Sequence, residues 1–97
     1  MTNPVAVQTT VPVVVGASYS EQTSSALIKT GDGFLCGVFV ASGSSPTMKL
    51  YDNTAASGTV MINTTALNIG WNPCPLHFSQ GLYATLGGTI DCTFSYV

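Results

Sequence analysis

Turn-forming residues divide this chain into stretches that are too short for stable helices. Glycine, proline, serine, asparagine and aspartate recur every several residues, and the stretches between them are rich in β-branched and aromatic side chains. Such stretches favour strands, and turns spaced by about 8 to 12 residues are typical of an all-β sandwich or barrel. We therefore expect an all-β fold, a single antiparallel β-sandwich or jelly-roll-like domain of about eight short strands, at residues 26–30, 34–41, 47–51, 59–62, 67–71, 76–78, 82–86 and 90–97.

The N-terminal segment has a composition of its own. A chain of 97 residues has the length of one domain, so residues 1–97 are expected to form one unit. Residues 1–20 are rich in valine but contain two prolines, which cannot donate a hydrogen bond to a neighbouring strand. This segment is interpreted either as an edge strand of its own sheet or as an extended arm that adds to a neighbouring subunit. Its run of three valines, Val13, Val14 and Val15, is a candidate oligomer interface.

The predicted strand at residues 34–41 is apolar on both faces. Strict alternation places Phe34, Cys36, Val38 and Val40 on one face, and Leu35, Gly37, Phe39 and Ala41 on the other. One face of an antiparallel sheet normally meets water, so this strand needs a second cover, either the N-terminal arm or another subunit. Leu35 and Phe39 are therefore further interface candidates.

The last two predicted strands are expected to form a hairpin around Gly87-Gly88. A two-residue loop would mix apolar and polar positions on one face, whereas a three-residue loop through Thr89 keeps them apart. This hairpin would pair Leu86 with Ile90, Ala84 with Cys92 and Leu82 with Phe94. Cys92 is accordingly predicted to lie in the core.

Charged side chains are unusually scarce. Only six residues carry a formal charge, the net charge is −2 and no arginine is present. Nucleic-acid binding needs several basic residues to neutralise phosphates, so a nucleic-acid partner is not expected. A surface of neutral polar residues gains little from charge repulsion, and it is more consistent with a protein covered by other copies of itself or by a larger partner.

The sequence also bears on processing and on the thiols. No apolar run is long enough to span a bilayer and no basic secretion signal begins the chain, so we expect synthesis in the cytoplasm and no membrane contact. Three cysteines cannot form a complete set of disulfides, and free, mostly buried thiols are expected. Cys36 and Cys92 are predicted to face inward, whereas Cys74 has no assigned role.

Catalytic chemistry finds little support. The single histidine, His77, is predicted to be a surface residue, and Asp32 and Asp52 lie in turn sequences where an aspartate bonds its own backbone. Cys74 and His77 have a spacing seen in zinc sites, but two ligands do not make a four-ligand site. We expect no catalytic, cofactor-binding or metal-binding residue, and a non-enzymatic protein; an unrecognised small hydrolase is a much weaker interpretation.

Three residues support an alternative function. Trp71 is followed by Asn72, and Tyr51 is followed by an aspartate and an asparagine. Aromatic rings beside such polar groups can stack on sugars, so Trp71, Tyr51 and Asn72 form a candidate glycan platform. The competing interpretation is that Trp71 caps the core at the end of a strand, before an Asn72-Pro73 turn.

Taken whole, residues 26–97 resemble the small all-β structural proteins of tailed bacteriophages, in particular capsid decoration (cement) and head-associated proteins. The resemblance lies in four short segments, GFLCGVFV at 33–40, MKLYDN at 48–53, FSQGLYA at 78–84 and GTIDCT at 88–93. It implies a β-sandwich or jelly-roll subunit, a homotrimer or homodimer that binds the major capsid protein on the outer surface of the shell and stabilises it.

The predicted function is therefore a non-enzymatic, homo-oligomeric virion protein located at the capsid surface. A tail or head-fibre adaptor is a closely related interpretation. The carbohydrate-binding module is the alternative from a different class.

Overall fold

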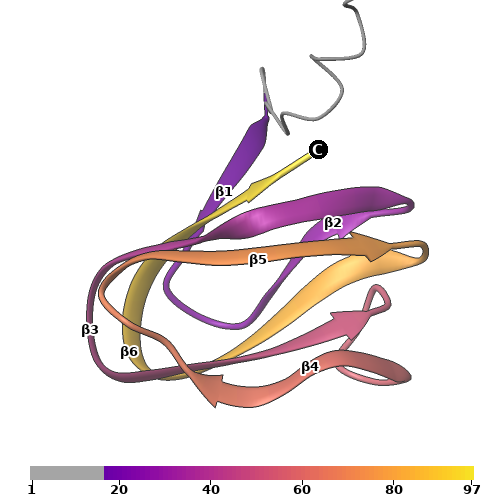
Figure 1. Ribbon diagram of the computed structural model, residues 1–97. Coiled ribbons are helices and arrows are strands. Elements are labelled where there is room, and N and C mark those ends of the chain that lie inside the picture. The colour runs from indigo at the N-terminus through magenta and orange to yellow at the C-terminus, as the bar shows by residue number, and fades with distance from the viewer. Residues whose placement is uncertain (1–16) are drawn as a thin grey trace, which may run out of the picture.

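Residues 17–97 form a single antiparallel β-sheet of six strands. The computed structural model describes residues 17–97, and no helix able to span a bilayer occurs in them (Figure 1). The strands are β1 (Ser18–Gln22), β2 (Ala26–Thr30), β3 (Gly33–Asp52), β4 (Thr59–Ala66), β5 (Gly70–Phe78) and β6 (Gly81–Tyr96). The prediction of an antiparallel all-β architecture is confirmed.

Two long strands organise the sheet. β3 and β6 pair with each other over almost their full lengths, from Leu35 opposite Tyr96 to Tyr51 opposite Tyr83. The free side of β6 pairs with β1 near its C-terminal end and with β2 near its N-terminal end. The free side of β3 pairs with β5 in its first part and with β4 in its second part. Each end of the central pair therefore carries two additional strands.

β3 and β6 bend together, which turns the sheet back on itself (Figure 1). The register shifts between Ser44 and Thr47, and both strands have a residue with positive φ at the bend, 50° at Ser45 and 71° at Gly88. The backbone N–H of Ser44 donates to Thr89 Oγ1 at 2.8 Å across it. Because of the bend, both halves of the sheet contribute to one core, which consists of Ile28, Leu35, Val38, Val40, Met48, Leu50, Leu67, Phe78, Leu82, Ala84, Ile90, Cys92 and Phe94.

The predicted hairpin at Gly87-Gly88 is wrong. β6 continues through both glycines, and its residues pair with β3 instead of with each other. Cys92 lies opposite Val40 and Ala84 opposite Leu50, where the prediction had paired Ala84 with Cys92. The inward-facing set was nevertheless correct, because the alternation along β6 buries Leu82, Ala84, Ile90, Cys92 and Phe94.

The strand count differs for the same reason. Three predicted turns, at residues 42–46, 72–73 and 87–88, lie inside strands β3, β5 and β6. The predicted turns between β2 and β3, between β3 and β4 and between β5 and β6 are present as chain reversals. The eight expected strands therefore become five, β2 to β6, of which β3 and β6 are long, and β1 from the N-terminal segment is the sixth strand.

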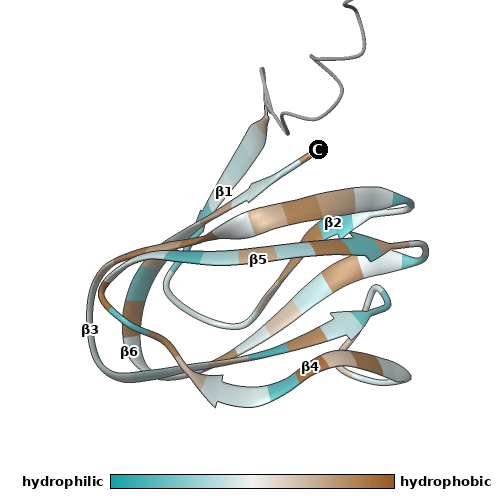
Figure 2. Ribbon diagram, viewed as in Figure 1, coloured by the Kyte–Doolittle hydropathy of each residue, from teal (hydrophilic) through white to brown (hydrophobic). Residues whose placement is uncertain are grey.

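A bulge in β3 corrects the predicted faces of that strand. The register with both neighbours shifts between Leu35 and Gly37, so Leu35 shares a face with Val38 and Val40 despite the odd spacing. Leu35 is 1% exposed, whereas Phe39 is 49% exposed. Leu35 therefore belongs to the core, and the prediction that it shares a face with Phe39 is wrong. Figure 2 shows the long apolar stretch in the first part of β3.

Part of the N-terminal segment can be placed. Its residues from Ser18 onward begin β1, an edge strand whose Ser18 lies opposite Tyr96 of β6. Residues 1–16, including the interface candidates Val13, Val14 and Val15, lie outside the described residues.

Candidate functional site

The surface formed by the outward side of the first part of β3 and of β5, called here the outer face, carries several exposed apolar side chains. Phe34 and Phe39 of β3 are 53% and 49% exposed, and Trp71 of β5 is 49% exposed. Along β5, exposure alternates so that Trp71, Pro73, Pro75 and His77 point outward. Neither proline can donate a ladder hydrogen bond, which is consistent with β5 pairing only with β3, at the edge of the sheet.

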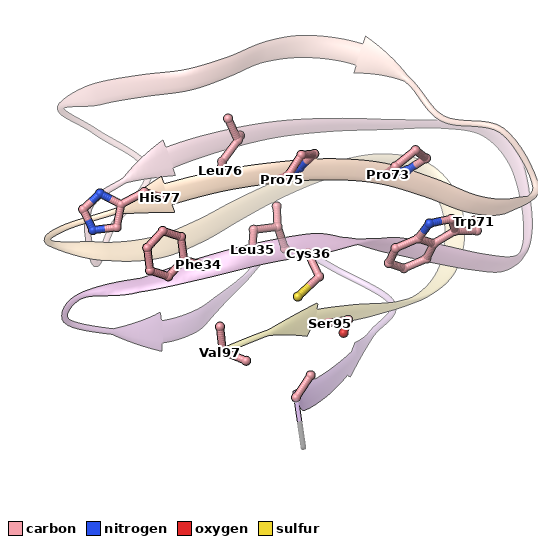
Figure 3. Close-up of a pocket in the computed structure, with 11 residues that line it drawn as sticks. Phe34, Leu35, Cys36, Trp71, Pro73, Pro75, Leu76, His77, Ser95 and Val97 are labelled. Carbon is pink, nitrogen blue, oxygen red and sulfur yellow. The ribbon is translucent and has the colours of Figure 1, made fainter. Parts of the chain in front are cut away.

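A groove of about 870 Å³ runs over the outer face. Figure 3 shows His77 and Phe34 at one end, Trp71 at the other, and Pro73 and Pro75 between them along β5. Its other lining residues come from β3, from β5, from the end of β6 and the residue after it, and from the residue before β1: Leu35, Cys36, Leu76, Ser95, Val97 and Ala17. The lining is mostly apolar, so the groove suits an apolar chain segment better than a polar small molecule.

Glycine inside β3 makes room for the tryptophan. A Cβ on Gly37 would lie 2.6 Å from two carbons of the Trp71 ring and 2.7 Å from the carbonyl oxygen of Asn72. The indole therefore lies directly over the β3 backbone. Trp71 covers the outer face within β5, and the prediction that it caps the core before an Asn72-Pro73 turn is wrong.

The polar end of the groove is a hydrogen-bonded histidine–aspartate pair on the surface. His77 Nε2 lies 2.6 Å from Asp32 Oδ1, and the two side chains are 52% and 69% exposed. The imidazole also packs on the Phe34 ring, with ring centroids 4.8 Å apart. His77 is exposed, as predicted, and within residues 17–97 its side chain has a hydrogen bond only with Asp32. The Asp32 carboxylate was expected to bond the backbone of its own turn, but it bonds His77 of β5 instead.

The glycan candidates do not come together. Trp71 lies opposite Phe39 in β3, whereas Tyr51 lies twelve positions further along β3 (51 − 39) and contacts Tyr83 in an edge-to-face arrangement. Lys49 Nζ lies 5.2 Å from the centroid of the Tyr51 ring. The two aromatic residues therefore belong to different halves of the bent sheet.

Asn72 has a structural role. Its Nδ2 donates to the carbonyl oxygens of Asn68 at 2.9 Å, Gly70 at 3.1 Å and Val38 at 3.3 Å. Its Oδ1 accepts the backbone N–H of Asn68 at 3.1 Å. These bonds use the hydrogen-bonding capacity of the amide to hold the β4–β5 connection against β3.

The three cysteines are free thiols in different surroundings. Cys36 is half-buried and lines the groove, so the prediction that it faces inward is wrong. Burial raises the pKa of the Cys74 thiol. Burial and the nearby Asp91 and Glu21 carboxylates raise the pKa of Cys92 to about 11. At neutral pH, Cys74 and Cys92 are therefore poor nucleophiles, and Cys36 is the thiol that reports on the groove.

Two carboxyl groups lie close together outside the groove. The pKa of Glu21 is raised by a hydrogen bond with Asp91 and by repulsion from its charge, with a further contribution from desolvation. Among the described residues, no group of three or more histidine, cysteine, aspartate or glutamate side chains is placed to hold a metal ion.

Asp52 closes the turn between β5 and β6. Partial desolvation acts to raise the pKa of its carboxyl group, but hydrogen bonds from the backbone N–H groups of Gln80, Ser79 and Gly81 outweigh this and hold the pKa below its ordinary 3.8. The shortest of these bonds, from Gln80 to Oδ1, is 2.7 Å. The aspartate predicted to bond its own turn instead connects the end of β3 to a different turn.

Replacing Asp52 by asparagine is expected to lower the free energy of unfolding by about 1 kcal/mol at pH 7, since the lost charge-assisted bonds are largely exposed to solvent. A carboxylate with a lowered folded pKa stabilises the protein well above pH 3.8, and this contribution declines as the pH falls below 3.8 toward the folded pKa. The difference between wild type and Asp52→Asn in urea titrations should therefore shrink on acidification. An equal difference at pH 7 and pH 3 would show that the ionised carboxylate is not the source of the stability.

We compared the chain with protein-family models, with curated proteins and with solved structures, and none of them matches. A function therefore has to be inferred from the outer face, its groove and the sequence.

Proposed function

We propose that this protein is a non-enzymatic structural protein that works by assembly through its outer face. The observation that carries the proposal is the group of three large hydrophobic side chains, Phe34, Phe39 and Trp71, each about half exposed on neighbouring strands of one surface. Soluble monomers rarely expose a contiguous apolar surface of this kind, which is typical of sites of protein–protein contact.

The specific form we propose is a phage capsid decoration protein, a homotrimer or homodimer that binds the major capsid protein at the surface of the virion. This assignment rests on the sequence resemblance and on the scarcity of charge, six charged residues in 97. A protein that covers a shell gains strength from many simultaneous weak contacts, for which neutral polar and apolar surfaces are sufficient. We also propose that the bent sheet acts as a compact, sandwich-like subunit in such an assembly.

The mass in solution tests assembly directly. Size-exclusion chromatography with light scattering should give two or three times the chain mass of 10.0 kDa. A monomer at high concentration would contradict self-assembly through the outer face. Binding to assembled capsid shells, measured by co-sedimentation, would then decide whether a shell partner alone covers this surface.

Replacing Phe39 by aspartate should lower the oligomeric mass while the chain stays folded, because the side chain is 49% exposed and contributes to the outer face. The effect expected is at least a tenfold weakening of self-association, equivalent to about 1.4 kcal/mol. Val60→Asp on β4 is the matched control, since Val60 is 42% exposed on a different part of the sheet. Equal effects of the two substitutions would place the contact elsewhere.

Carbohydrate binding is a second candidate, supported only by the half-exposed Trp71 beside an open groove. Trp71 is the only tryptophan in the chain, so its fluorescence reports on this position alone. Titration with a panel of oligosaccharides should change the emission if a sugar stacks on the indole. An unchanged emission across the panel would remove this candidate.

A further inference from the structure

The chain enters the described structure at the edge of the groove. Ala17, the first described residue, lines the groove, and β1 begins at the next residue. Sixteen residues precede Ala17 in the sequence. Gly16 is the last of them, and the five before it are Val11, Pro12, Val13, Val14 and Val15. An apolar segment therefore begins beside the apolar groove.

The distances allow this segment to cover the groove. Four strands lie side by side in the order β1, β6, β3, β5, and three spacings of about 4.8 Å give a width of about 14 Å. Glu21, Thr93, Phe39 and Trp71 lie opposite one another on the four neighbouring strands. Glu21 is four residues (21 − 17) after Ala17, so Trp71 lies about 13 Å further along the strand direction than Ala17. The diagonal from Ala17 to Trp71 is thus about 19 Å, and six extended residues span about 20 Å.

The chemistry of the segment matches that of the groove. Residues 11–15 carry no charge, and among the described lining residues the polar side chains are few: His77, bonded to Asp32 at one end, Cys36 and Ser95. Pro12 has no N–H and favours an extended backbone, so it suits packing through side chains better than pairing at a sheet edge. Gly16 separates the segment from Ala17 in the sequence, and glycine allows the widest range of backbone angles, so this link does not restrict the direction of the segment.

We propose that residues 11–15 lie across the groove of their own chain, running from Ala17 past Cys36 to Trp71. The link through Gly16 is short, so the segment is present at a high effective concentration beside its own groove. This inference goes beyond the proposed assembly. Docking would cover Trp71 and so remove it from the surface available for assembly, whereas Phe39 does not line the groove and stays exposed for contact with a partner. Docking of the segment and self-assembly through Phe39 can therefore fail independently.

The first test compares two double variants of the full chain with the same spacing, V13D/V15D and V5D/V7D. The first pair should shift Trp71 emission to longer wavelength, increase its quenching by acrylamide and speed the reaction of Cys36 with a thiol reagent by roughly tenfold, because two carboxylates oppose docking. The second pair should leave all three readouts as in wild type. Equal effects, or no effect, of the two pairs would overturn the proposal.

A disulfide-trapping experiment does not depend on disrupting the protein. In Val13→Cys and Val14→Cys, oxidised glutathione should join the new thiol to Cys36, with two thiols oxidised to one disulfide and the reagent reduced to two glutathione molecules. The expected product has the mass of a single chain, and Val5→Cys should give little of it. A disulfide between two chains would show that the segment lies on the groove of a second copy. A yield no higher than that of the Val5→Cys control would show that the segment does not cover the groove. Either result overturns the proposal. Measured beside the oligomeric mass of the same sample, these outcomes separate failure of docking from failure of assembly.

Discussion

Replacing Leu35 by alanine is expected to lower the free energy of unfolding by about 3 kcal/mol, and replacing it by aspartate should prevent stable folding. Leu35 is 1% exposed and shares the core with Val38 and Val40. Removing a buried leucine side chain costs about 2 to 5 kcal/mol, and a buried carboxylate adds a larger cost. Small domains are stable by only about 5 to 15 kcal/mol, so the aspartate variant should lose its cooperative transition in urea titrations followed by circular dichroism.

The neighbouring Phe34 provides the control. It is 53% exposed, so Phe34→Ala should cost less than about 1 kcal/mol in the same titrations. A small effect at Leu35 together with a large effect at Phe34 would mean that the bulge in β3 is absent and that strict alternation holds. The pair of variants therefore tests the face assignment on which the outer face depends.

The second large effect is expected at Gly88, where alanine should cost about 3 kcal/mol or more. Gly88 has φ of 71°, and a side chain in this region costs about 1 to 2 kcal/mol. A Cβ there would also press on the backbone carbonyl oxygen of Ser45 and lie 2.7 Å from that of Ser44. Backbone atoms cannot rotate away as a flexible side chain does, so the paired bend of β3 and β6 would have to open.

Gly31 is the matched control for this prediction. Its φ is 87°, but a Cβ there would meet no atom of the described structure within 4 Å. Gly31→Ala should therefore show only the cost of the backbone conformation. The urea midpoint of Gly88→Ala should be clearly lower than that of Gly31→Ala. Equal midpoints would show that the close approach of Gly88 to β3 does not contribute to stability.

Much of the core could be predicted from periodicity. The alternation in residues 82–96 identified Leu82, Ala84, Cys92 and Phe94 as inward-facing, and all four are buried. This prediction held although the hairpin was wrong, because the side chains of a strand alternate whichever strand it pairs with. The partner depends on contacts far apart in the sequence, which a local pattern does not contain.

The bends show the same limit. Residues 42–46 and 87–89 have turn chemistry, and the backbone does depart from regular strand geometry at Ser45 and Gly88. Each departure bends its strand without reversing the chain, because the two bends lie opposite each other and stay paired through Ser44 and Thr89. A local signal for positive φ therefore does not distinguish a reversal from a paired bend.

The candidate site was only partly predictable. Phe39 was identified correctly as an apolar residue outside the core, but Phe34 was assigned to the wrong face and Asn72-Pro73 of β5 was read as a turn. Gly37 was the available signal, since glycine inside a strand often marks a bulge or a close approach, and here it marks both.

By itself, the sequence determined that this protein is all-β, which side chains of β6 face inward and that its surface carries little charge, because these properties depend on residue type and on local period. Only the tertiary structure decided that two long strands bend together, that a bulge moves Leu35 into the core and that Phe34, Trp71 and His77 line one groove. These features depend on register between distant segments, and a shift of one residue moves every following side chain to the other face.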